Sequence, residues 1–301
     1  MSKRALFPSI WINEFSSKSE FDANGKKLKD FFEVADAIDD KLLTSRHSFH
    51  LKAYCVVCQA VTSMHIDWHF CGTSPGGDVN PAWTETAVCE GCVLNSRMRA
   101  LIDLLTRLKD ESEIRRVFVA EQTTQSFKVI KSLFKNVTGS EYLGPKFSSG
   151  HIHPFVKSHS LIRHEDLTSL SFPQETFDLI ITQDVFEHIP QFSRAFAECA
   201  RVLVPGGRLV FTIPFFPERY ETTIRASVAA DGSIAHHHPP EFHGNPLSSQ
   251  GSLCFQNFGW DILDHLKRSG FRHVFAAMYW GPWQGHLGFP FFVFSAAKPT
   301  I

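Results

Sequence analysis

The sequence predicts a protein of the α/β class, and one stretch of the chain carries most of this prediction. The run 177–182 is apolar enough to be a strand buried on both faces of a parallel sheet, and the acidic turn 183–188 follows it. Pro205-Gly206-Gly207 ends the next helix, and the apolar run 208–213 begins a second strand. The helix between the strands has one apolar face, made by Phe192, Phe196, Cys199 and Leu203. The polar turn therefore lies at the carboxyl end of a buried strand, where open α/β sheets bind their ligands.

The residues of this strand-helix-strand unit resemble a known enzyme family. The segments FDLIITQDVFEHI (177–189) and ARVLVPGGRLVFTIPF (200–215) are similar to the fourth and fifth strands of class I S-adenosylmethionine-dependent methyltransferases. The resemblance rests on the acidic turn, the Glu187-His188 pair and the Leu-x-Pro-Gly-Gly exit. It implies a Rossmann-like sheet of seven strands with helices on both faces, an enzyme, and S-adenosylmethionine as cofactor. A generic Rossmann-like unit with another ligand is the alternative.

The strand order of that family can be followed along the rest of the chain. The first five strands are expected at 117–120, 138–143, 161–163, 177–182 and 208–213. The last two are expected at 272–279 and 291–296, after a helix 260–268 that Gly270 stops. The segment 217–257, between the fifth strand and this helix, is too long for an ordinary connection, and we interpret it as an insertion.

Composition and charge narrow the kind of partner. The chain is 43% hydrophobic and 20% charged, which is ordinary for a globular protein, and most of its 29 phenylalanines are assigned to core and cleft lining. A net charge of −1 offers no overall basic field, so a small-molecule substrate is favoured over nucleic acid, and a homodimer stays open. Residues 1–15 lack the features of a secretory signal, and no run approaches the ~18 apolar residues of a membrane span. A cytoplasmic protein without membrane contact is expected.

Four of the seven cysteines form two CxxC pairs, Cys55-Cys58 and Cys89-Cys92. Each pair can present two thiolates to one tetrahedral ion, so we predict a structural zinc site with no open position for substrate. Reduced cysteines or a redox pair are the alternatives. The interval between the pairs is expected to loop out with little order. Three of its residues could replace one ligand, namely His65, His69 and Cys71.

The segments around the cysteines complete the predicted domain organisation. A helix is expected from Asn95 or Ser96, with Arg97 and Arg99 on solvated surface. Contact of one of these arginines with a carboxylate or phosphate in the cleft is the alternative. Residues 1–50 are expected to form a helical and partly mobile segment, with 16–30 exposed. The predicted domains are thus 1–50, a small amino-terminal zinc-binding domain 51–112, and a methyltransferase domain 113–301 that contains the insertion 217–257.

The turn after the first strand departs from the family's glycine-rich pattern. It reads Glu121-Gln122-Thr123 and continues without glycine to Ser126. Either polar side chains take over the hydrogen bonds of the usual loop, or cofactor binding has been lost. The segment HHHPPEFHGNPLSSQGSLCFQNFGWDILDHLKRSGF (236–271) resembles a bacterial group of methyltransferases that shares this turn and the paired CxxC knuckles. That resemblance implies that the missing glycines are a trait of the group.

Other positions match the cofactor residues of the family. Glu141, followed by Tyr142, ends the second strand, where a carboxylate can accept both ribose hydroxyls. The resemblance further implies that Asp166-Leu167 contacts the adenine and that Gln183-Asp184 closes the floor of the site. Each acid taken alone is equally well a solvated loop carboxylate.

The insertion is rich in histidine and is predicted to contribute to the acceptor site. Its candidate general bases are His238 and His243, with His188 outside the insertion as a third. A second metal site, for zinc or iron, and a purely structural loop are the alternatives. Phe215, Phe216, Trp280 and Trp283 are expected to line the cleft.

These residues together predict a methyltransferase acting on oxygen or nitrogen of a small polar metabolite, such as a sugar or a biosynthetic intermediate. The alternatives are an RNA methyltransferase with zinc knuckles, and a non-catalytic methyltransferase-fold scaffold.

Overall fold

The computed structural model describes residues 11–73, 79–155 and 160–300. The chain divides into two compact units that are not contiguous in sequence. The first unit comprises Met1–Phe15, Ser19–Glu111 and Ala276–Val293. The second unit comprises Ser16–Lys18, Ser112–Phe275 and Phe294–Ile301.

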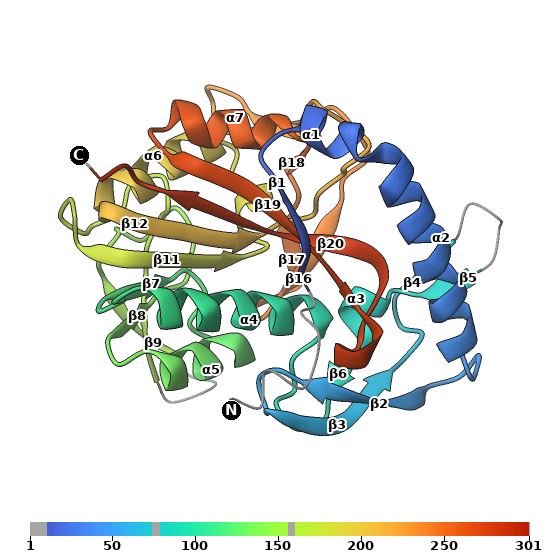
Figure 1. Cartoon of the computed structure of the whole chain (residues 1–301). Helices are drawn as coiled ribbons and strands as arrows, with labels where there is room; N and C mark the ends of the chain where they lie inside the picture. The colour runs from blue at the N-terminus through green and yellow to red at the C-terminus, as the bar shows by residue number, and fades with distance from the viewer. Residues whose placement is uncertain (1–10, 74–78, 156–159, 301) are drawn as a thin grey trace. The chain divides into compact units, whose positions relative to one another are not determined.

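A sheet of seven strands has the order β1-β19-β20-β12-β11-β7-β8 (Figure 1). The strands β8, β7, β11 and β12 run parallel to one another, while β20 runs antiparallel to β12 and β1 runs antiparallel to β19. Their bounds are β1 Trp11–Phe15, β7 Val117–Val119, β8 Val137–Gly139, β11 Phe177–Gln183, β12 Leu203–Thr212, β19 Arg272–Gly281 and β20 His286–Ala297. The predicted mixed, Rossmann-like sheet of seven strands is confirmed.

The central strands are buried on both faces, as their apolar sequences predict. All three residues of β7 are buried, and so are the five consecutive residues from Leu179 to Gln183 in β11. In Figure 1, α6 (Phe192–Val202) and α7 (Asp261–Arg268) lie on one side of these strands and α5 (Gln125–Leu133) on the other. The apolar face predicted for α6 is buried, and α7 ends just before Gly270, whose φ of 102° suits glycine.

The prediction for the third strand of the sheet was wrong. Residues Ser160–Arg163 do form a strand, β10, but it pairs antiparallel with β9 (Ile152–Phe155) in a separate ladder. Just after β10, His164 forms one parallel bridge with Glu141, which lies just after β8. Leu161 is 65% exposed, so this segment lacks the two-sided burial that a central strand requires. The seventh strand is β1, which the sequence did not indicate.

The insertion consists of short antiparallel ladders. It contains β13 Thr223–Ile224, β14 Ala226–Val228, β15 Ile234–His236, β16 Phe242–Asn245, β17 Ser248–Leu253 and β18 Gln256–Asn257. The pairs are β13 with β18, β14 with β15, and β16 with β17. Hydrogen bonds hold its end to the short 3₁₀ helix η2 (Phe186–His188): the Phe255 N–H donates to the Glu187 carbonyl (2.7 Å), and Gln256 Nε2 donates to the Phe186 carbonyl (2.5 Å). The insertion is therefore fixed to the turn that follows β11.

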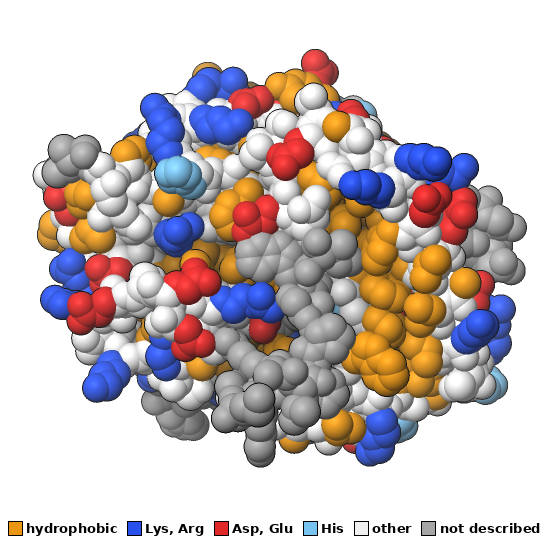
Figure 2. Space-filling model, in the orientation of Figure 1, with side chains coloured by type: hydrophobic (Ala, Val, Ile, Leu, Met, Phe, Trp, Pro, Cys, Tyr) orange, Lys and Arg blue, Asp and Glu red, His pale blue; other side chains and the backbone are white. Residues whose placement is uncertain are grey.

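The first unit contains more regular structure than the sequence predicted. Its elements are most of α1 (Lys18–Ala23), α2 Gly25–Leu42, β2 Phe49–Cys55, β3 Ala60–Ile66, β4 Cys71–Thr73, β5 Val79–Pro81, α3 Trp83–Thr86, β6 Val88–Cys89, α4 Ser96–Glu111 and η3 Pro282–Gln284. The interval between the cysteine pairs thus forms strands and a short helix rather than a disordered loop, and 16–30 is largely helical. Figure 2 shows acidic and basic side chains interspersed on the face drawn, with a group of hydrophobic side chains beside α2. None of the described helices combines the length and apolar character needed to cross a bilayer.

Candidate functional site

The glycine-free turn after β7 is held in place by its own polar side chains. Glu121 Oε1 accepts a hydrogen bond from the Gln183 N–H (2.5 Å) at the end of the neighbouring strand β11. Thr123 donates from both its N–H and its Oγ1 to Glu141 Oε1 (2.7 Å each). These bonds tie the turn to the carboxyl ends of two other strands, which shows how the turn keeps its shape without glycine.

The side chain of Gln122 completes this arrangement. Its Nε2 donates to the Leu161 carbonyl (2.9 Å), and its Oε1 accepts from the Arg163 N–H (3.0 Å). The glycine that the turn itself lacks is found on β8, because a Cβ at Gly139 would lie 2.6 Å from Gln122 Cβ and 2.5 Å from the ring of Phe127. Close approach of the turn to β8 therefore depends on Gly139, whose role the sequence did not reveal.

Several buried polar atoms at this edge of the sheet have no hydrogen-bond partner among the described residues. They are Glu121 Oε2 and both side-chain atoms of Gln183, Oε1 and Nε2. Burial raises the pKa of Glu121 well above its usual value, and the nearby carboxyl groups of Glu141, Asp184 and Glu187 raise it further. Because unpartnered buried polar groups cost roughly 1–3 kcal/mol each, this edge is suited to a polar ligand.

Two other predicted cofactor residues, Glu141 and Asp166, each accept hydrogen bonds from a threonine through one carboxylate oxygen. Glu141 Oε1 accepts both bonds from Thr123; burial raises the Glu141 pKa, and the hydrogen bonds from Thr123 and from the Gln122 backbone oppose that shift. Asp166 Oδ1 likewise accepts from the N–H (2.8 Å) and Oγ1 (2.7 Å) of Thr168. Leu167 is buried, and Tyr142 is 54% exposed.

Asp184 lies beside Gln183 with a strained backbone. Its φ is 53°, in the left-handed region that residues with a side chain seldom adopt. Its Oδ1 accepts from Thr212 Oγ1 (3.0 Å), and its N–H donates to the Thr212 carbonyl (2.9 Å). Strain of this kind concentrates at functional sites because the surrounding structure has to enforce it.

Two of the predicted histidines lie together, and the third does not. His243, on β16, and His188, in η2, have ring centroids 5.1 Å apart, and both face Glu187. His238 is exposed, and its backbone N–H donates to the Arg225 carbonyl (3.2 Å). Glu187 raises the pKa of His243 to about 9 against the opposing effect of burial. With this pKa His243 would carry a proton at neutral pH, where it could not accept another.

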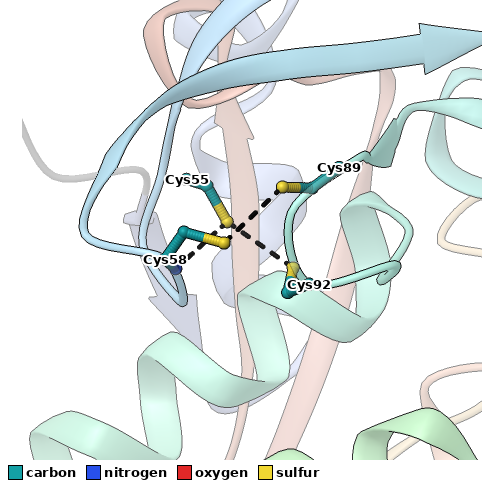
Figure 3. Close-up of side chains that lie close together, drawn as sticks. All are labelled: Cys55, Cys58, Cys89 and Cys92. Atoms are coloured by element: carbon teal, nitrogen blue, oxygen red, sulfur yellow. Dashed lines mark hydrogen bonds between the residues drawn. The ribbon is translucent and has the colours of Figure 1, made fainter.

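The four paired cysteines converge in the first unit (Figure 3). Cys55 Sγ lies 3.7 Å from Cys92 Sγ, and Cys58 Sγ lies 3.8 Å from Cys89 Sγ. A tetrahedral zinc ion with Zn–S bonds of about 2.3 Å would place its sulphur atoms about 3.8 Å apart. Cys71 is exposed, and its Sγ donates to the Trp68 carbonyl (2.9 Å). The cluster therefore has the dimensions of a four-thiolate metal site.

Arg99 was predicted on solvated surface, and this was wrong. Its side chain is fully buried and donates to three backbone carbonyls, those of Ala87, Gln284 and Gly285. Burial lowers the pKa of Arg99, while the sulphur atoms of the cysteine cluster oppose that shift. The ion pairs of the described residues supply no carboxylate for this guanidinium. Arg97 pairs instead with Glu85 (2.8 Å), and Asn95 Oδ1 caps α4 by accepting from the Met98 N–H (2.9 Å).

The first unit has a surface hollow of about 660 Å³. It is formed by α1 and α2 and lined by apolar side chains such as Phe21, Leu28 and Phe32. None of the predicted cofactor, acceptor or metal residues lines it, so the candidate sites rest on the side-chain geometry described above.

Comparison with known proteins identifies part of the second unit. Residues 124–211 match a family model described as a methyltransferase domain. This segment of the chain is similar to methyltransferase domains. The matched segment covers α5 to β12 and includes Glu141, Asp166, Gln183 and Glu187, but it ends before the insertion. The prediction of a methyltransferase enzyme is confirmed by this match.

Several solved structures are similar to this chain over about two thirds of its length. An S-adenosylmethionine-dependent methyltransferase from Mesorhizobium loti is 19% identical, with 64% of this chain and 96% of that chain covered and a TM-score of 0.38. The 1,6-didemethyltoxoflavin-N1-methyltransferase of Burkholderia thailandensis, solved with 1,6-didemethyltoxoflavin and S-adenosylhomocysteine, is 15% identical, with coverages of 67% and 78% and a TM-score of 0.39. Phospholethanolamine N-methyltransferase 2 of Haemonchus contortus is 13% identical, with coverages of 68% and 54% and a TM-score of 0.41. A search of curated proteins found no match.

Proposed function

We propose that the methyltransferase domain binds S-adenosylmethionine at the carboxyl ends of β7, β8 and β11 and methylates a small polar metabolite. The unpartnered atoms of Glu121 and Gln183 carry this proposal, because they are buried polar groups at the edge where the cofactor of this family would lie. When bound, the cofactor supplies an electrophilic methyl group on a positively charged sulphur. The acidic surroundings of Glu121 suit such a cation.

Each residue of this edge has a separate task in the proposal. Glu141 Oε2 accepts a ribose hydroxyl, since Oε1 is already used by Thr123. Asp166 accepts the adenine amino group and Leu167 contacts the ring. Glu121 and Gln183 meet the charged amino-acid end of the cofactor, and ionisation of Glu121 is favoured once a cation lies beside it.

The acceptor is proposed to enter on the side of His188 and His243. The insertion brings His243 to this position and covers the end of η2, so it shapes the space around the transferred methyl group. Methyl transfer requires the acceptor atom, the methyl carbon and the sulphur to lie in line, and positioning alone accelerates such a step greatly. We propose oxygen or nitrogen of a metabolite such as a sugar as the acceptor, in a cytoplasmic enzyme.

We also propose that Cys55, Cys58, Cys89 and Cys92 hold a structural zinc ion, as in the bacterial group with CxxC knuckles that the sequence resembles. The sulphur distances support this assignment, and so does the backbone: the residue after each knuckle, Gln59 or Val93, has a positive φ, of 52° and 59°. The anionic zinc-thiolate group would also supply the negative charge that buried Arg99 lacks.

Calorimetry with S-adenosylhomocysteine tests the cofactor proposal. Glu141→Ala is expected to weaken binding by on the order of 2 kcal/mol, about 30-fold, as for a hydrogen bond to a charged group. The matched control is Glu218→Ala, which removes a 60% exposed carboxylate of the same unit that pairs with Arg219. No binding by the folded wild-type protein would end the proposal, and equal affinity in Glu141→Ala and wild type would remove Glu141 from the site.

A further inference from the structure

Three potential metal ligands converge beside the proposed cofactor site. Glu187 Oε1 lies 3.4 Å from His243 Nδ1 and 3.7 Å from His188 Nε2. Ligand atoms about 2.1 Å from one ion in tetrahedral geometry lie about 3.4 Å apart, so one ion would fit between these three atoms with small adjustments. The three residues come from two elements, η2 and β16, which the hydrogen bonds of the insertion hold together.

In each histidine ring, one nitrogen is already hydrogen-bonded, and the other nitrogen is the one near Glu187. His188 Nδ1 lies 2.8 Å from the Leu253 carbonyl, which can only accept, so the proton is on Nδ1 and the lone pair is on Nε2. His243 Nε2 lies 3.0 Å from Glu241 Oε1, and the other oxygen of Glu241 lies 3.2 Å from Arg225 Nη2. Metal-binding histidines nearly always donate their second N–H to a carbonyl or carboxylate in this way.

Glu187 provides the independent sign that a ligand belongs here. Its side chain is fully buried, and neither carboxylate oxygen has a hydrogen-bond partner among the described residues. The separation of 3.4 Å from His243 Nδ1 is long for a hydrogen bond. A buried carboxylate is costly unless a cation lies against it, and the cation at Glu187 is either protonated His243 or a metal ion held by the same three side chains.

We propose that Glu187, His188 and His243 bind a divalent transition-metal ion such as Mn²⁺, Fe²⁺ or Zn²⁺. Two histidines and one carboxylate are a donor set that suits such ions and leaves coordination positions open. This site is separate from the four cysteines, whose closed thiolate shell would have no open position.

The open positions would take a hydroxyl group of the acceptor, a step that rests on the proposed methyltransferase function. Coordination lowers the pKa of the bound hydroxyl, whose proton passes to solvent water. The oxygen lone pair then forms the new C–O bond to the methyl carbon. The C–S bond breaks, and its electron pair stays on sulphur, which becomes neutral. The metal site thus favours an O-methyltransferase whose acceptor carries a hydroxyl, with neighbouring oxygens to chelate the ion.

Binding of Mn²⁺ alone, followed by electron paramagnetic resonance of the free ion, tests the metal site on the full chain. Mn²⁺ prefers oxygen and nitrogen ligands, so the cysteine cluster does not compete for it. Wild type is expected to bind one ion per chain. His243→Asn and Glu187→Gln should weaken binding by at least 10-fold, and Glu241→Gln, which removes only the charge behind His243, by roughly 10-fold.

Two control variants distinguish this site from its neighbours. His238→Ala changes an exposed histidine, and Cys254→Ser changes the thiol of a competing set formed by Glu241, His243 and Cys254. Both should bind Mn²⁺ as wild type does. Circular dichroism establishes that each variant is folded, and if Glu187→Gln does not fold, the partly exposed His243 carries the test.

The metal site and the cofactor site are judged by separate measurements. Absence of Mn²⁺, Fe²⁺ and Zn²⁺ binding outside the cysteine cluster, or unchanged binding in His243→Asn, would overturn the metal proposal. Calorimetry with S-adenosylhomocysteine on the same protein reports on the methyltransferase proposal alone. If the protein binds S-adenosylhomocysteine but no metal, the methyltransferase proposal stands and the metal proposal fails. If it binds the metal but no S-adenosylhomocysteine, the metal proposal stands and the methyltransferase proposal fails.

Discussion

Replacing Gly139 by alanine tests whether the glycine on β8 makes the glycine-free turn feasible. A Cβ at this position would lie 2.5 Å from the Phe127 ring and 2.6 Å from Gln122 Cβ, both well inside normal contact. Gln122 cannot move away easily, because its side chain bonds to the backbone of Leu161 and Arg163. Overpacking of this kind costs roughly 1–3 kcal/mol. Each kcal/mol lowers the melting temperature by roughly 2–4 °C for a domain of the size of the second unit.

Urea unfolding of the variant gives the magnitude, and calorimetry with S-adenosylhomocysteine gives its effect on the site. Displacement of the turn should also weaken the cofactor, because Thr123 orients Glu141. Phe127→Leu removes the ring atoms that clash and should restore part of the stability in the double variant. Gly244→Ala is the control, since nothing lies within 4 Å of a Cβ built there. If Gly139→Ala were no less stable than Gly244→Ala, the proposed role of Gly139 would be refuted.

Two further predictions concern the first unit. Cys58→Ser should abolish stoichiometric zinc and destabilise the unit far more than Cys71→Ser, because zinc binding is coupled to folding; metal analysis and thermal unfolding check this, and equal loss in both variants would contradict it. Burial raises the pKa of Asp39 from 3.8 to about 7 although the Gly288 N–H opposes the shift, so the folded state binds the extra proton and stability falls as pH rises through this range. Asp39→Asn should remove roughly 2–3 kcal/mol of that fall between pH 5 and pH 8. Urea unfolding at both pH values checks this, and a fall in the free energy of unfolding as large as that of the wild type would contradict it.

The parts of the fold that local sequence determines were predictable. The strands β7, β11 and β12 are apolar runs that both faces of a sheet bury, and α6 and α7 follow from helical periodicity and the glycine after α7. The pairing of 160–163 with 152–155 depends on a contact between segments that no local pattern links. The same holds for β1, whose partner β19 lies far along the chain.

The candidate site divides in the same way. The CxxC spacing of the cysteines is visible in the sequence and predicts a common site, and the structure brings all four together. The burial of Arg99 could not be predicted, because its acceptor carbonyl on Gly285 is 186 residues away and arginine is ordinarily exposed. The choice between His238 and His243 depends on the pairing of β16 with β17, which places His243 beside Glu187, and histidine composition alone cannot supply that register.

The discontinuity of the first unit bears on how this protein can be cut and how it can have arisen. Its third segment, 276–293, is reached only after the chain has passed through Ser112–Phe275 of the second unit, and it provides the partner strand of β1 and two of the three carbonyls that hold Arg99. A fragment of residues 113–301 would leave the edge of β19 without β1, and unpaired edges of this kind promote aggregation. A fragment of residues 1–112 would bury the Arg99 guanidinium without two of its three acceptors. End-to-end gene fusion could not by itself have assembled such a unit, since it also needs residues supplied from within the carboxyl-terminal hairpin. Expression of the two units as separate polypeptides would therefore have to divide the chain after Glu111, after Phe275 and after Val293.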